Sequence, residues 1–83
     1  MFKYWHDGEY ITIERGTLRI IRQYFLHYTK KAVAEIIGVS QSTMRRIEKP
    51  NCHIRKSTYE KIVLFYHQAL IQLGWELERP QHV

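Results

Sequence analysis

The chain contains little cysteine, proline or acidic charge, and it has no long apolar run. Its 83 residues include one cysteine, two prolines and eight Asp or Glu, against thirteen Lys or Arg. A lone Cys52 excludes an internal disulfide and agrees with a reducing compartment. No apolar stretch approaches the roughly 18 residues of a membrane span, and MFKYWHDGEY lacks the apolar core of a signal peptide. We therefore expect a cytoplasmic protein.

The residue patterns of common catalytic and metal sites are also missing. The sequence offers no Ser, His and Asp set, no paired carboxylates and no glycine-rich phosphate loop. Cys52 and His53 are adjacent, so they do not have the spacing of a metal site, and the other histidines form no ligand pattern. A single small domain also has little apolar surface to spare for a buried active site. We expect a protein that is not an enzyme and that uses neither a cofactor nor a metal.

Positive charge is concentrated in the middle of the chain. The net charge is +5 at pH 7, yet residues 15–61 alone hold eleven Lys or Arg and three acids, a net charge of +8. Residues 1–14 carry a net charge of −2, and residues 62–83 carry −1. This distribution favours a polyanionic partner for the central segment.

Residues 1–14 have the pattern of a β-hairpin. In FKYWHDGEYITI, Asp-Gly separates two β-prone runs, which is a strong signal for a two-residue turn. Such a turn would place Trp5 opposite Tyr10 and would create one apolar face. That face consists of Phe2, Tyr4, Ile11 and Ile13. The hairpin could cover the helices of its own chain, form a dimerisation sheet, or bring Lys3 to DNA, and its negative charge favours the dimerisation sheet over the DNA arm.

Residues 17–73 are expected to form a helical core. A first helix over 17–27 would bury a stripe at i, i+3 and i+7 that consists of Leu18, Ile21 and Phe25. A longer last helix would open with a capping box of Ser57 and Glu60, and a short strand over 75–78 would follow it. The predicted fold is therefore one mainly α domain with an added β element.

Two short helices are expected between these, over residues 30–37 and 41–49. Thr29 and Ser40 are good N-terminal caps, and Gly38 can adopt the left-handed conformation that ends the first of the two helices. Two helices joined by a short turn that contains glycine have the arrangement of a helix-turn-helix, whose second helix enters the DNA major groove.

The second of these short helices has an apolar face and a polar face. At about 100° per residue, Met44 and Ile47 point inward, whereas every outward side chain is a hydrogen-bond donor of a kind that pairs with base edges or phosphates. The outward set is Gln41, Ser42, Arg45, Arg46 and Lys49. The one acid, Glu48, lies at the margin of the core and is expected to pair with Arg22 or Arg19.

The segment TKKAVAEIIGVSQSTMRRIEK, residues 29–49, resembles the helix-turn-helix of the Cro and lambdoid-repressor family, also called the XRE family. The shared features are Ala34, Gly38-Val39 at the turn, Ser40-Gln41-Ser42, Met44 and Ile47. The resemblance implies a four- to five-helix lambda-repressor-like domain, a helix-turn-helix over 30–49 and a recognition helix over 41–49. It also implies a transcription regulator of a bacterium, plasmid or phage. The N-terminal hairpin is not part of the family's usual pattern.

The resemblance further implies which side chains contact DNA. Base contacts are implied for Gln41, Ser42, Arg45 and Arg46. Phosphate contacts are implied for Lys30, Lys31, Lys49, Asn51, His53, Arg55 and Lys56. Which of the two adjacent arginines points into the groove, and which one holds the backbone, stays open.

The last helix is apolar nearly all round, so it has a second surface to bury. Either the hairpin covers this surface within one chain, or a homodimer does so, with strand pairing through 75–78 or the hairpin as an extension. The predicted dimer interface is Leu64, Phe65, Ile71 and Trp75. A homodimer is expected because one recognition helix reads only a few base pairs, and two copies read an inverted repeat.

We therefore expect a repressor that binds an inverted-repeat operator in double-stranded DNA as a homodimer. The alternative is the antitoxin of a toxin–antitoxin pair, which would bind its own promoter and use its apolar surface to cover the toxin. A third possibility is a protein-interaction module that has kept the fold and lost DNA binding.

Overall fold

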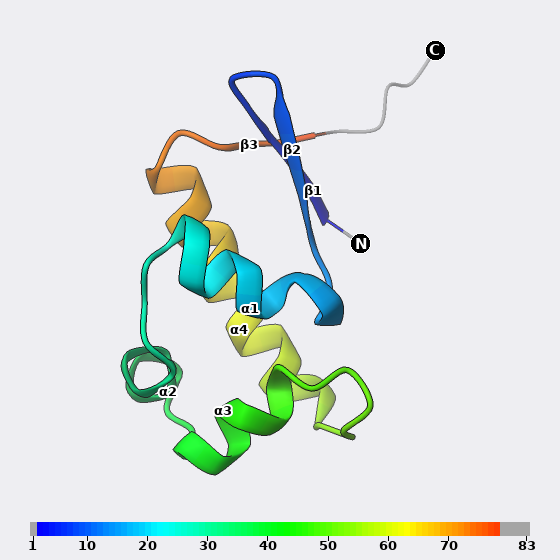
Figure 1. Ribbon diagram of the computed structural model, residues 1–83, viewed down its shortest axis with the longest axis vertical. Helices are drawn as coiled ribbons and strands as arrows, with labels where there is room; N and C mark the ends of the chain where they lie inside the picture. The colour runs from blue at the N-terminus through cyan, green and yellow to red at the C-terminus, as the bar shows by residue number, and fades with distance from the viewer. Residues whose placement is uncertain (1, 79–83) are drawn as a thin grey trace.

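A computed structural model describes residues 2–78 as a mainly helical fold with a small antiparallel sheet (Figure 1). The sheet lies at one end of the molecule, and the helices α2 (Lys30–Ile37) and α3 (Gln41–Ile47) lie at the other. Helix α4 (Lys56–Gln72) runs between the two ends. Of the predicted domain over 1–83, Met1 and residues 79–83 lie outside the described part. No helix within the described part is both long and apolar enough to cross a membrane.

The N-terminal hairpin forms with the register that a two-residue turn predicts. Strand β1 (Phe2–His6) pairs with β2 (Glu9–Ile13), and the turn residues Asp7 and Gly8 have φ angles of 49° and 81°. Positive φ at both central positions is what a type I′ turn requires. A third strand, β3 (Glu76–Leu77), pairs with the other edge of β1, so the strand order is β2-β1-β3.

The sheet covers the helices of its own chain. On its inner face, Tyr4, Ile11 and Ile13 are buried in the same cluster as the helical core residues. The strand predicted over 75–78 is shorter and pairs with β1 of the same chain. The hairpin thus packs on its own helices, but it does not cover the second apolar surface of α4, because Leu64 and Ile71 stay 57% and 43% exposed.

Trp75 belongs to this core. It is 7% exposed, and its ring stands edge-on to that of Phe25 with 5.4 Å between the centroids. The prediction that Trp75 lies in a dimer interface is therefore wrong, because its side chain is already used within the monomer.

The single helix predicted for residues 17–27 is replaced by three successive kinds of turn. A 3-10 turn η1 (Arg15–Thr17) leads into a short α-helix α1 (Leu18–Ile20) and then into a π-helical segment η2 (Ile21–Phe25). The Thr17 hydroxyl donates to the backbone carbonyl of Thr12, so the tight first turn is attached to the end of the hairpin. This side-chain bond competes with regular helix formation at the start of the segment.

The caps of the two short helices are as predicted. The Thr29 hydroxyl accepts from the N–H of Ala32 at 3.0 Å, and the Ser40 hydroxyl accepts from the N–H of Thr43 at 3.0 Å. Gly38 ends α2 with a φ of 77°. Helix α3 is two residues shorter than the predicted 41–49 and ends at Ile47.

The predicted capping box at the start of α4 is wrong. The helix begins at Lys56, so Ser57 already lies in its first turn and cannot act as the cap. Arg55 occupies the cap position, and no side chain of the described residues caps it. A capping box does form at the start of η1, between Glu14 and Thr17.

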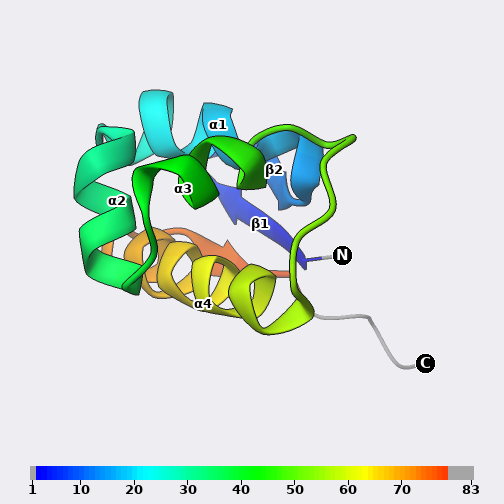
Figure 2. The same cartoon turned by 90° about the horizontal axis from the view of Figure 1, so that it is seen from below.

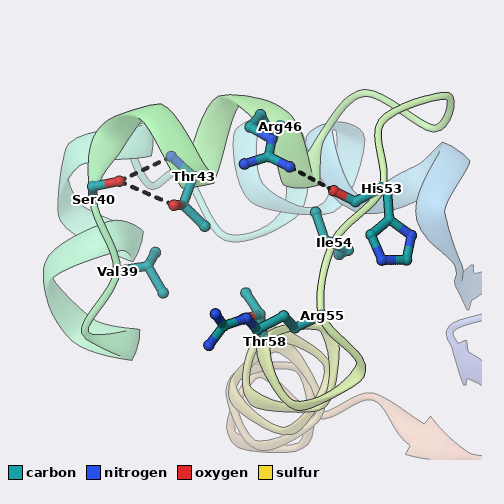
Figure 3. A pocket seen from close by; sticks show the side chains of 8 residues that line it. All are labelled: Val39, Ser40, Thr43, Arg46, His53, Ile54, Arg55 and Thr58. Atoms are coloured by element: carbon teal, nitrogen blue, oxygen red, sulfur yellow. Dashed lines mark hydrogen bonds between the residues drawn. The ribbon is translucent and has the colours of Figure 1, made fainter.

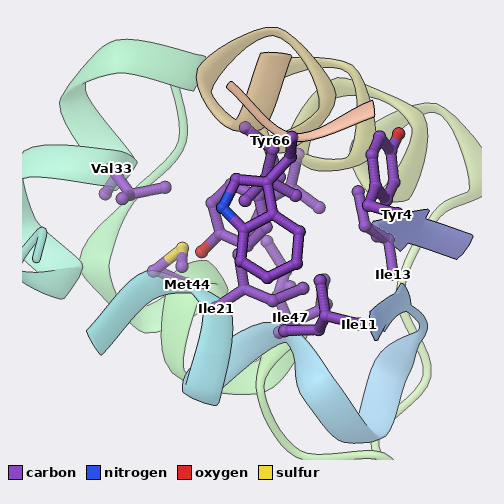
Figure 4. Packing of buried hydrophobic residues seen from close by; sticks show 13 residues of the cluster. Tyr4, Ile11, Ile13, Ile21, Val33, Met44, Ile47 and Tyr66 are labelled. Carbon is purple, nitrogen blue, oxygen red and sulfur yellow. The ribbon is translucent and has the colours of Figure 1, made fainter. Parts of the chain in front are cut away.

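The core contains one buried hydroxyl without a hydrogen-bond partner among the described residues, that of Tyr66. Figure 4 shows Tyr66 packed in the apolar cluster that also holds Ile21, Met44 and Ile47. Burial in this cluster raises the pKa of Tyr66 above its ordinary value. The neutral phenol is therefore strongly preferred in the folded state.

We expect Tyr66→Phe to raise the free energy of unfolding by about 1 kcal/mol, because the ring stays and an unsatisfied hydroxyl is removed. The wild-type free energy of unfolding should fall as the pH rises above about 10, where the unfolded chain ionises Tyr66 and the folded state does not. The free energy of unfolding of Tyr66→Phe should fall less over the same pH range. Urea unfolding at neutral and alkaline pH measures both effects, and a variant less stable than wild type at neutral pH would contradict the expectation.

Candidate functional site

Helix α3 presents its polar face outward at one end of the molecule. Viewed from that end, it lies in front, with α2 on one side and the loop that leads to α4 on the other (Figure 2). Met44 and Ile47, on the opposite face of α3, are fully buried, as the helical projection predicts. All four side chains predicted to contact bases are exposed; they are Gln41, Ser42, Arg45 and Arg46.

The side chains predicted to contact phosphates fall into two groups on either side of α3. One group, Lys30 and Lys31, lies in the first turn of α2. The other group follows α3 along the loop and reaches the start of α4; it consists of Lys49, Asn51, His53, Arg55 and Lys56. All of these residues are exposed except Lys30, which is half-buried. The structure thus places basic side chains from separate parts of the chain on both sides of α3.

A hollow of about 570 Å³ lies between α3, the loop and the start of α4 (Figure 3). Its lining residues are Val39, Ser40, Thr43, Arg46, His53, Ile54, Arg55 and Thr58. Two guanidinium groups and three hydroxyl side chains border it, and it adjoins the first turn of α4, whose backbone N–H groups receive no side-chain cap within the described residues. Cations beside the free N–H groups of a helix start have the chemistry to bind an anion such as phosphate.

The two adjacent arginines of α3 differ in their surroundings. Arg46 lines the hollow and donates from Nη2 to the backbone carbonyl of His53 at 2.9 Å (Figure 3). Arg45 is exposed and takes no part in the side-chain hydrogen bonds of residues 2–78. One guanidinium is therefore held against the loop, and the other is available to a ligand.

A buried ion pair holds the end of α3 to the segment before α2. Arg22 donates from Nε and Nη2 to the two carboxylate oxygens of Glu48 at 2.6 and 3.1 Å, and the two side chains are 7% and 4% exposed. Its remaining nitrogen, Nη1, donates to the backbone carbonyl of Tyr28 at 2.8 Å. The hydrogen bond to Glu48 raises the pKa of Arg22 above its ordinary value. Of the two predicted partners of Glu48, Arg22 is confirmed, and Arg19 is exposed.

Sequence reasoning missed Arg15, which it counted only as one more positive charge. The Arg15 guanidinium donates to four backbone carbonyls at the end of α3 and in the loop beyond it; they belong to Arg46, Ile47, Lys49 and Cys52. These acceptors are 31 to 37 residues away along the chain. No local pattern marks such a contact, because backbone carbonyls are present at every position.

An apolar hollow of about 430 Å³ lies where α4 meets the sheet. Its lining residues are Phe2, Tyr4, Tyr59, Glu60, Val63, Leu64, His67 and Leu77. Of the predicted dimer interface, Leu64 and Ile71 are exposed by 57% and 43%, whereas Phe65 is half-buried beside the ring of Tyr28. Phe2 at the hollow is 49% exposed and was not part of the predicted interface.

Within residues 2–78, no group of three His, Cys, Asp or Glu side chains is placed to hold a metal ion. Comparison with protein-family models, with curated proteins and with solved structures finds no significant match for this chain. A function must therefore be inferred from the residues of α3 and their surroundings.

We expect Glu48→Ala to lower the free energy of unfolding by about 3 kcal/mol, because it leaves the buried Arg22 guanidinium without its counter-charge. The matched control is Glu60→Ala, which removes an exposed carboxylate 4.0 Å from Lys56 and should change stability by less than about 0.5 kcal/mol. Urea unfolding of both variants measures the difference. Equal effects would show that the buried pair does not hold the end of α3.

Proposed function

We propose that this chain is a sequence-specific regulator of transcription that binds double-stranded DNA with α3 in the major groove. One observation carries the proposal: an exposed helix face made of hydrogen-bond donors lies between two groups of cations, and its only acid is withdrawn into a buried ion pair. An exposed carboxylate at this place would repel phosphates, and the pair with Arg22 removes that charge. The arrangement of α2, Gly38 and α3 supports a helix-turn-helix.

Base reading is assigned to the outward side chains of α3. A seven-residue helix is about 10 Å long, which suits a major groove about 12 Å wide. Gln41 can pair with adenine, Ser42 with several base edges, and Arg45 with guanine O6 and N7. Because Arg46 is tied to the loop and faces the cationic hollow, we assign it to the DNA backbone.

Phosphate binding is assigned to the two flanking groups of cations. Lys30 and Lys31 would hold one strand, while the hollow beside Arg55 and His53 would hold a phosphate of the other. Each phosphate neutralised by a Lys or Arg contributes about one unit to the salt dependence of binding. These contacts would set the position of the protein on DNA without selecting a sequence.

We expect Arg45→Ala to lower affinity for a selected duplex by about tenfold or more and to relax preference at one base pair, because a bidentate base contact is worth about 1–3 kcal/mol. Lys56→Ala is the matched control: it should weaken all sequences alike and reduce the salt slope by about one unit. Selection from a random duplex library, followed by titration at several salt concentrations, measures both.

Two results would count against the proposal. If no duplex is enriched from the library even at low salt, the protein does not bind DNA specifically, and an interaction module becomes the better description. If Arg45→Ala changes affinity without changing sequence preference, α3 is not the reading element.

We further propose that two copies bind an inverted repeat. The support is the unburied apolar surface along α4, where Leu64, Ile71 and Phe2 are about half exposed. In Figure 2, α4 runs along one side of α3, so a partner on that flank would leave the polar face of α3 uncovered. Two half-sites then lie about one helical turn of DNA apart. In the antitoxin alternative, a toxin would occupy the same surface.

We expect the wild type to have a dimeric mass at micromolar concentration and Leu64→Glu to be monomeric, because a buried unpaired carboxylate opposes association. Ile36→Glu is the matched control, since Ile36 is a similarly exposed apolar residue, 52% exposed, on α2 rather than α4, and this variant should keep the wild-type mass. Light scattering provides the measurement. A monomeric wild type would contradict the dimer. The library selection and the titrations would then still test whether a single copy binds DNA.

A further inference from the structure

Helix α3 ends without the left-handed glycine that follows α2 and α4. Helices α2 and α4 are followed by glycines in the left-handed conformation, Gly38 with a φ of 77° and Gly74 with a φ of 98°. Glu48, which follows α3, has an ordinary φ of −81°. The last carbonyls of a helix have no donors within it, and a left-handed residue normally helps to supply them. The backbone N–H groups of Glu48 and Lys49 donate to the carbonyls of Met44 and Arg46, but within residues 2–78 no backbone N–H donates to the carbonyl of Ile47. The last carbonyl of α3 therefore depends on a side-chain donor.

Arg15 supplies this donor and adds contacts to three neighbouring carbonyls. Its Nε donates to the carbonyl of Ile47 at 2.9 Å, and its Nη2 donates to the carbonyl of Cys52 at 2.9 Å. The same Nη2 also contacts the carbonyls of Arg46 and Lys49 at 3.2 and 2.5 Å. We call this set of contacts the Arg15 clamp. A positive charge at a helix C-terminus is also favoured by the helix dipole.

The clamp joins α3 to the end of the hairpin. Arg15 opens η1, which follows β2 after one residue, Glu14, and Thr17 fixes this turn. The Thr17 hydroxyl donates to the carbonyl of Thr12 and accepts from the N–H of Glu14 at 3.0 Å. The backbone that carries Arg15 is therefore tied to the sheet before its side chain reaches α3.

We infer that Arg15 is a positioning residue through which the hairpin orients α3 and the loop that follows it. The clamp holds the last turn of α3, which carries Arg45 and Arg46, together with the loop that leads to Arg55. It thereby sets the base-reading helix and the phosphate-binding loop at one fixed spacing. This inference rests on the proposed DNA-binding function, and it gives the N-terminal hairpin a role in sequence discrimination.

The test uses Arg15→Lys, which keeps the charge but replaces the planar fork of donors with a single ammonium. We expect the ratio of specific to non-specific DNA affinity to fall about tenfold, because rigid placement matters for base contacts more than for phosphate attraction. Non-specific affinity and its salt slope should stay at the wild-type values. The matched control, Arg19→Lys, changes an exposed arginine of the same segment and should leave the ratio unchanged.

Two outcomes of the DNA titrations overturn the inference. An unchanged ratio in Arg15→Lys means that the clamp does not control discrimination. Equal losses of specific and non-specific affinity in Arg15→Gln, with a salt slope reduced by about one unit, mean that Arg15 itself contacts a phosphate.

Amide hydrogen exchange on the free protein tests the clamp without DNA. In Arg15→Lys, exchange at the N–H groups of Lys49 and Cys52 should be at least severalfold faster than in wild type, because both lie in the clamped turn. Exchange in α2 should be unaffected, and Arg19→Lys should match wild type throughout. Unchanged exchange at Lys49 and Cys52 overturns the clamp even if the protein binds DNA. A wild type without sequence preference would instead overturn the proposed function, and the exchange result would still decide whether the clamp orients α3.

Discussion

The buried pair of Arg22 and Glu48 is the contact on which the candidate site depends. It is a two-point contact between a guanidinium and a carboxylate, with 7% or less of either side chain exposed, and a third bond ties Arg22 to the carbonyl of Tyr28. One residue of the core thereby fixes both the end of α3 and the turn that leads into α2. If the pair were broken, an uncompensated charge would remain in the interior, so these elements are coupled energetically as well as in space.

This coupling matters because α3 has only seven residues. An isolated helix of this length is not stable in water, and its orientation must come from tertiary contacts. Met44 and Ile47 anchor its inner face, Arg22 holds Glu48, and Arg15 holds its terminal carbonyls. Packing, an ion pair and a set of hydrogen bonds thus act on one short element. Among the outward side chains of α3, only Arg46 makes a hydrogen bond to the loop; the others are available to a ligand.

Local signals predicted much of the fold. The hairpin register follows from the turn residues Asp7 and Gly8, since one slip would expose the whole apolar face. The caps Thr29 and Ser40 were predictable because their bonds reach only three residues along the chain. The capping box at Ser57 failed because α4 begins at Lys56, two residues before the start that the motif predicts, with Arg55 at the cap position and no side-chain cap.

By itself, the sequence determined the elements whose causes are local: the hairpin, the caps of α2 and α3, and the polar and apolar faces of α3. The tertiary structure decided what depends on distant partners. It placed Trp75 in the core rather than on the surface, separated the environments of Arg45 and Arg46, and brought Arg15 to carbonyls more than thirty residues away. The physical reason is that periodicity and turn chemistry are properties of neighbouring residues. Burial and long-range hydrogen bonds depend on which surfaces meet, and the folded chain alone settles that.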